Sequence, residues 1–132
     1  EYCGTNHSRM VGSVTVIEPA EYEAWLSGGH ANEPPAVAGK RLFEELRCAN
    51  CHAPPEAGPV RGPPLPNVFG HQVTLKGGQT VTADEDYLRE SILRPGAKIV
   101  QGYEPIMPSF DGQVDEEQLI QLIAYIKSLA MP

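Results

Sequence analysis

The residues most able to do chemistry in this chain are two cysteines and a histidine in the segment Cys48-Ala49-Asn50-Cys51-His52. Two thiols three positions apart can add to the two vinyl groups on one side of a porphyrin, and the next residue then places an imidazole beneath the iron. Covalent attachment lets a small domain hold a large cofactor with little secondary structure. The motif therefore predicts one haem c, attached through Cys48 and Cys51, with His52 as an axial ligand of the iron.

Three other interpretations of this motif stay open. A zinc site needs about four ligands, and a set completed by His71 would place the adjacent Cys51 and His52 on one metal, which is awkward. A thioredoxin-type dithiol follows a strand in a βαβ unit, whereas a helical pattern precedes this motif. The third is a chance occurrence of the spacing. Haem attachment is the favoured interpretation.

A methionine near the C-terminus is the candidate for the second axial ligand. Met107 lies between Pro105 and Pro108, which stiffen the segment so that a thioether can be held on iron with little loss of entropy. The alternative is that Met107 only packs in the core, the commoner fate of a methionine. Ligation by His52 and Met107 would fill both axial positions, raise the reduction potential and leave no place for oxygen or peroxide. We therefore expect single-electron transfer and no catalytic residues.

The composition restricts the partners of the chain. The 132 residues carry a formal charge of −7, which disfavours binding to nucleic acid or to a membrane surface through clustered Lys and Arg. No apolar run approaches the roughly 20 residues that span a bilayer. The chain begins abruptly, without the basic start and apolar centre of a signal peptide, which suggests a piece of something longer.

The first quarter of the chain is expected to contain a short strand, a short helix and a linker. The β-branched run over 11–17 predicts a strand. Pro19 can begin a short helix that ends near Leu26, and the Gly, Pro and small polar residues over 27–36 predict a linker. We therefore divide the chain into residues 1–17, a short helix and linker over 18–35, and a main domain over 36–132.

The main domain is expected to be mainly α-helical. An apolar stripe predicts a helix over 37–46, before the cysteine motif; its members are Val37, Leu42, Phe43 and Leu46. Residues 53–71 contain six prolines and predict an ordered loop. The β-branched segments on either side of Gly77-Gly78 predict a small hairpin over 73–82.

Two more helices are predicted from capping boxes. Thr82 with Glu85 is expected to begin a helix that ends near Leu93, before Pro95-Gly96. Asp115 with Gln118 is expected to begin the last helix. The apolar stripe of that helix has a clean helical spacing and consists of Leu119, Leu122, Ile123, Ile126 and Leu129.

From about residue 36 to 130 the order of these parts resembles the class I cytochromes c. In that family an amphipathic helix, C-x-x-C-H, a Gly-Pro loop, a middle helix, an M-P loop and a terminal helix surround one haem c. Gly39 and Phe43 match the residues of the first helix that pack on the last one, and Gly62-Pro63 matches the Gly-Pro pair. The resemblance implies that the Pro63 carbonyl accepts a hydrogen bond from the His52 ring. The predicted hairpin departs from the minimal family pattern.

The first ten residues carry a second resemblance. Glu1, Cys3, His7 and Met10 have the spacing that ends the binuclear copper (CuA) motif C-x-E-x-C-x-x-x-H-x-x-M in subunit II of cytochrome c oxidases. The first Cys of that motif would lie just before residue 1, and an upstream His ligand is absent as well. The resemblance implies the last loop and strand of a truncated cupredoxin domain, whose copper ligands are expected to be occupied only in the full-length parent.

The two resemblances together indicate a haem-copper oxidase of the caa type, whose subunit II carries a fused cytochrome c domain. They imply that a soluble donor, such as a small cytochrome or an iron-sulfur protein, reduces the haem, which passes the electron to CuA. The expected location is periplasmic, or the outer face of the bacterial inner membrane. One alternative is a free cytochrome c that shuttles electrons. Another is a haem enzyme or gas sensor, which would require that Met107 does not bind the iron.

Overall fold

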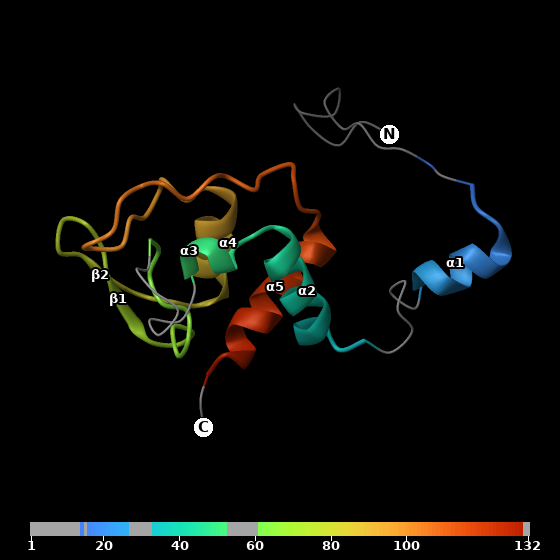
Figure 1. Ribbon diagram of the computed structural model, residues 1–132, viewed down its shortest axis with the longest axis horizontal. Coiled ribbons are helices and arrows are strands. Elements are labelled where there is room, and N and C mark those ends of the chain that lie inside the picture. The colour runs from blue at the N-terminus through green and yellow to red at the C-terminus, as the bar shows by residue number, and fades with distance from the viewer. Residues whose placement is uncertain (1–13, 15, 27–32, 53–60, 131–132) are drawn as a thin grey trace, which may run out of the picture. The chain divides into compact units, whose positions relative to one another are not determined.

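The computed structural model describes residues 14, 16–26, 33–52 and 61–130. Contacts divide the chain into two compact units, residues 1–33 and 34–132. The helices and strands are α1 (Pro19–Leu26), α2 (Pro35–Glu45), α3 (Ala49–His52), β1 (Gln72–Thr74), β2 (Thr80–Thr82), α4 (Glu85–Leu93) and α5 (Glu116–Ser128) (Figure 1). No helix in these described ranges is long and apolar enough to cross a membrane.

The first unit contains the short helix α1, as the Pro19 start predicted. The strand predicted over 11–17 is not confirmed. Residues 14, 16 and 17 have no strand conformation, and the other four lie outside the described residues. Val14 and Val16 are each 94% exposed, so these β-branched side chains pack on no sheet in the described part of this unit.

Helix α2 begins earlier than its apolar stripe predicted. Pro35 and Ala36, expected in the linker, form its first turn, because a proline at the first helical position loses no hydrogen bond that the helix needs. The inner face consists of Ala38, Gly39, Leu42 and Phe43. Val37, which the stripe included, is 50% exposed. The stripe therefore predicted the helix correctly and one of its buried residues wrongly.

Helices α2 and α5 pack against each other at a glycine. A Cβ added to Gly39 would overlap the backbone carbonyl of Gln121 and lie 2.9 Å from Cβ of Tyr125. On the same side of α2, the Phe43 ring meets the Tyr125 ring with centroids 5.2 Å apart. Only the absence of a side chain at position 39 lets the two backbones come this close. Figure 1 shows α2 lying against α5.

The N-terminus of α4 is capped by a residue that the sequence analysis passed over. The predicted box of Thr82 and Glu85 is wrong, because Thr82 is the last residue of β2. Asp84 is the N-cap instead, and its side chain accepts a hydrogen bond of 2.8 Å from the backbone N–H of Tyr87. Asp is at least as good an N-cap as Thr, and Thr82 is not available for this role because it lies in β2.

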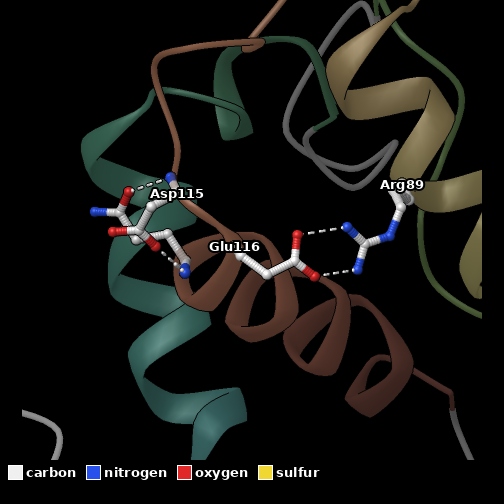
Figure 2. A network of polar contacts seen from close by, with 4 residues as sticks. Arg89, Asp115 and Glu116 are labelled. Atoms are coloured by element: carbon white, nitrogen blue, oxygen red, sulfur yellow. Dashed lines mark hydrogen bonds and ion pairs between the residues drawn. The ribbon is translucent and has the colours of Figure 1, made fainter. Parts of the chain in front are cut away.

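The predicted capping box of α5 is present. The Asp115 carboxylate accepts a hydrogen bond from the backbone N–H of Gln118. The side-chain amide oxygen of Gln118 accepts one from the backbone N–H of Asp115 (Figure 2). In the next position, Glu116 receives two hydrogen bonds from the Arg89 guanidinium on α4, at 2.7 and 2.8 Å. These bonds hold the pKa of Glu116 below its ordinary value. Lys127 and Glu85 form a second ion pair between the two helices.

The predicted hairpin is also present. Strands β1 and β2 pair antiparallel, with Val73 opposite Val81, and Gly77 and Gly78 adopt positive φ angles of 112° and 87° in the turn. The hairpin packs on the main core through partly buried Val73 and Val81. The core itself is one cluster of buried residues: Leu42, Phe43, Leu65, Leu75, Ala83, Tyr87, Leu88, Ile92, Phe110, Leu119, Leu122, Ile123 and Ile126.

The contact at Gly39 leads to the first prediction. In Gly39→Ala the new methyl must push α2 away from α5, so the free energy of unfolding should fall by about 3 kcal/mol. Urea titration followed by far-ultraviolet circular dichroism measures this loss. Gly96→Ala is the matched control, because a Cβ at Gly96 would meet no atom within 4 Å. Equal stabilities of the two variants would contradict this account of the helix contact.

Candidate haem-binding site

A sharp change of direction after α2 places the cysteine motif. Arg47 has a φ of 59°, in the left-handed region that few residues adopt, and the Cys48 N–H then donates to the Phe43 carbonyl at 3.0 Å. The next residues form the single helical turn α3, in which the His52 N–H donates to the Cys48 carbonyl at 3.0 Å. One turn of helix therefore brings both thiols and the imidazole together.

The His52 ring is held from behind by the backbone. Its Nδ1 lies 2.7 Å from the carbonyl oxygen of Pro63, the contact that the Gly62-Pro63 match implied. A carbonyl oxygen only accepts, so Nδ1 carries the hydrogen and Nε2 of the neutral ring keeps its lone pair. Gly62 packs directly on the ring: a Cβ there would lie 2.8 Å from Cε1 of His52. This backbone therefore fixes both the tautomer and the position of the imidazole.

The motif opens onto a cavity of about 760 Å³. Cys48, Cys51 and His52 line it, and so does Met107, although Met107 lies 55 positions after His52 in the sequence. The volume lies within the range of roughly 300–1,000 Å³ that is usual for cofactor sites. Much of the remaining wall is apolar and comes from Leu65, Val68, Leu88, Ile92, Phe110, Leu122 and Ile126.

The Cys48 thiol lacks the lowered pKa of a reactive redox cysteine. Burial raises the pKa of the Cys48 thiol, and the charge of Cys51 acts in the same direction. A reactive dithiol needs a lowered pKa, so this environment disfavours the thioredoxin-type interpretation. Within the described ranges, no three His, Cys, Asp or Glu side chains gather as metal ligands, so the zinc interpretation has no ligand set there.

The cavity wall also contains polar residues that the sequence did not indicate as site residues, among them Tyr87, Ser91 and Lys98. Tyr87 and Ser91 stand one turn apart on α4, and Lys98 follows that helix. Burial raises the pKa of Tyr87. The Ser91 hydroxyl has no partner with hydrogen-bond geometry in the described part of the chain. It nevertheless lies close enough to Tyr87 to act on the pKa of that residue in the opposite direction to burial. The sequence did contain one indication of this pair, since residues four positions apart on a helix, such as Tyr87 and Ser91, lie on the same face.

Lys98 is held in place by a carboxylate. Its Nζ lies 2.6 Å from Oε2 of Glu90, and this bond raises the pKa of Lys98 and lowers that of Glu90. A cation held by an ion pair therefore lines the cavity. The four residues matched to the CuA motif, Glu1, Cys3, His7 and Met10, lie outside the described residues.

Comparison with known proteins identifies the family. The family model for cytochrome c matches residues 36–130. This chain belongs to the cytochrome c family. Two relatives are a cytochrome c2 from Blastochloris viridis, 36% identical over 70% of this chain and 76% of its own length, and a cytochrome c from Guizotia abyssinica, 29% identical over 70% of this chain and 88% of its own.

A third relative matches almost the whole chain. It is a cytochrome c oxidase subunit 2 from Alkalihalophilus pseudofirmus, 33% identical over 98% of this chain. The chain spans 37% of the length of that subunit. It is thus a cytochrome c domain related to an oxidase subunit 2, and the similarity extends beyond the cytochrome c match at residue 36 toward the N-terminus.

Membership of the cytochrome c family implies a covalently bound haem c and a role in electron transfer. The residues present fit that group. The cavity has room for a large planar cofactor, and two thiols with the attachment spacing line it. In the neutral ring of His52, the bond from Nδ1 to Pro63 leaves Nε2 as the nitrogen that can bind a metal. When bound, haem c supplies an iron that gains and loses one electron.

The packing of Gly62 on the imidazole gives the second prediction. Gly62→Ala should push the His52 ring away from the Pro63 carbonyl, because the new Cβ would lie 2.8 Å from Cε1 and 3.0 Å from Nδ1. The variant should mature with less haem per polypeptide, measured as the ratio of Soret absorbance to total protein. Gly96→Ala, which adds a methyl in open space, should match the parent. A full haem content and an unchanged spectrum in Gly62→Ala would refute the positioning role.

Proposed function

We propose that this domain carries single electrons through a haem c held by Cys48, Cys51, His52 and Met107. The observation that supports it is the single cavity onto which these four side chains open. Each cysteine would form a bond from Sγ to a vinyl carbon, with the thiol hydrogen passing to the neighbouring carbon, so the attachment needs no oxidant. His52 and Met107 would be the axial ligands of the iron.

The arrangement of these residues favours electron transfer over catalysis. His52 is fixed by Pro63, and Met107 approaches from a loop stiffened by Pro105 and Pro108. A protein atom at each axial position leaves no coordination site for a substrate. The largely apolar wall would limit the contact of the haem with water. Fewer water molecules then need to reorient when the iron gains or loses an electron. The proposed role is therefore that of an electron carrier, with no enzymatic step in this domain.

We further propose that the electron goes to the CuA centre of an oxidase subunit II to which this domain belongs. Two observations support this route: the similarity to a subunit 2 over 98% of the chain, and the CuA spacing of Glu1, Cys3, His7 and Met10. The donor would be a small soluble cytochrome or an iron-sulfur protein. The site of action would be the periplasm, or the outer face of the bacterial inner membrane.

A free electron shuttle is the second candidate. The two cytochrome relatives support it, because the match with this chain covers 76% and 88% of their lengths. In that case residues 1–35 would be an extension with no part in the electron route. The two candidates use the same haem site and differ only in whether the acceptor is on the same polypeptide.

The third prediction tests the axial ligand. Met107→Ala should keep the haem through denaturation, seen as unchanged haem mass by denaturing mass spectrometry, but open the iron. The reduced protein should then bind carbon monoxide, and the reduction potential should fall by about 0.1 V or more. Ile120→Ala, which changes a side chain on α5 that is 50% exposed and does not line the cavity, is the control and should remain low-spin. A parent-like spectrum in Met107→Ala would show that another group binds the iron.

The fourth prediction separates the two routes. In the full-length protein, a linker of about ten residues would keep the acceptor at roughly millimolar effective concentration. Oxidation of the haem by CuA, followed by flash photolysis, should therefore have a rate constant that is unchanged over a tenfold range of protein concentration. The isolated domain mixed with a separate copper domain is the control, and its rate should rise in proportion to concentration. The same proportional rise in the full-length protein would support the free shuttle instead.

A further inference from the structure

The segment that follows Met107 is bonded to the C-terminal end of α4. The backbone N–H of Phe110 donates to the Ile92 carbonyl at 3.2 Å, and the hydroxyl of Ser109 donates to the Leu93 carbonyl at 2.6 Å. Figure 1 shows this orange segment passing the gold helix α4. Two successive residues of the loop therefore meet the last two carbonyls of the helix.

These carbonyls belong to the part of a helix that lacks partners of its own. The last four C=O groups of an α-helix have no intrahelical N–H to accept from. Arg94 leaves the helical conformation with φ −134° and ψ 65°, and Pro95 has no N–H to donate. The segment after Met107 thus donates hydrogen bonds to the last carbonyls of α4, although it is distant from them in sequence. The same bonds hold this segment in place on α4.

Ser109 is the centre of this attachment. Its hydroxyl donates to Leu93 and also accepts from the backbone N–H of Asp111 at 3.2 Å. Its carbonyl accepts from the Gln113 side chain at 2.7 Å. The next residue, Phe110, is only 8% exposed and belongs to the core. One side of Ser109 is therefore fixed to buried structure, and the other side leads through Pro108 to Met107.

We propose that Ser109 is a positioning residue that holds the Met107 thioether in the haem cavity. This inference rests on the proposed ligation of the iron by Met107. Pro108 fixes one backbone angle between the two residues, so the position of Ser109 limits where Met107 can lie. When the hydroxyl is bonded to α4, the thioether remains near the iron even if its bond to the metal breaks. Ser109 therefore raises the effective concentration of the ligand, which favours rebinding.

Competition with a small external ligand measures this effect. Imidazole binds ferric iron only when Met107 has left, so its apparent affinity rises as methionine ligation weakens. Ser109→Ala should bind imidazole roughly three to five times more tightly than the parent, the factor expected for loss of the bond to Leu93, the shorter of the two hydrogen bonds that this hydroxyl makes. Ser109→Thr keeps a hydroxyl and should restore an affinity within about twofold of the parent.

A matched control separates positioning from general stability. Ser128 makes the same type of bond, from its hydroxyl to the Tyr125 carbonyl at 2.7 Å, on a different helix. Ser128→Ala should leave the imidazole affinity unchanged. An affinity of Ser109→Ala equal to that of Ser128→Ala would overturn the proposal, and so would a failure of Ser109→Thr to restore the parent value.

Met107→Ala distinguishes failure of this inference from failure of the proposed ligation. If Met107→Ala binds imidazole much more tightly than the parent while Ser109→Ala does not, the ligand assignment stands and the role of Ser109 is wrong. If Met107→Ala binds imidazole like the parent, Met107 is not the ligand and the basis of the inference is lost. Tighter binding in both variants, with a larger effect in Met107→Ala, supports the two proposals together.

Discussion

The close approach of α2 to α5 at Gly39 is the contact on which the other features of the cytochrome c domain depend. It brings the backbone of α2 against Gln121, and the inner face of α5 then extends Leu122 and Ile126 into the cavity wall. The end of α2 leads within three residues to Cys48, through the left-handed turn at Arg47. One helix crossing therefore places both the attachment motif and part of the apolar wall that faces the cofactor.

The charged side chains stabilise the arrangement around this crossing without entering the core. Arg89 and Glu116 form a bidentate ion pair between α4 and α5. Lys127 pairs with Glu85 on the same two helices. The Nζ atom of Lys127 also lies 4.8 Å from the centroid of the Phe69 ring. Exposed pairs of this kind each contribute little free energy, but their geometry limits how α4 can turn on α5. Since α4 carries Tyr87, Ser91 and the base of the Met107 loop, the orientation of that helix decides the shape of one wall of the cavity.

The features that could be predicted from the sequence were local ones. The attachment motif is read from the spacing of Cys48, Cys51 and His52 alone, and the Asp115 box needs only four consecutive residues. The errors arose where distant parts of the chain decide the outcome. Thr82 could not cap α4 because pairing with Gln72 had placed it in a strand, and Val37 remained exposed because Gly39 sets which face of α2 meets α5. The polar wall residues Tyr87, Ser91 and Lys98 were missed for the same reason, since they face a cavity that exists only in the folded domain.

Because α2 and α5 lie at opposite ends of the domain, the haem cavity can be completed only late in folding. These helices, at residues 35–45 and 116–128, cannot pair until almost the entire domain has been synthesised, and closing so long a loop costs chain entropy that only the finished contact repays. Until then the part of the cavity wall formed by Leu122 and Ile126 is missing. The packing of the last helix is thus the step that completes the cavity around the cysteine motif.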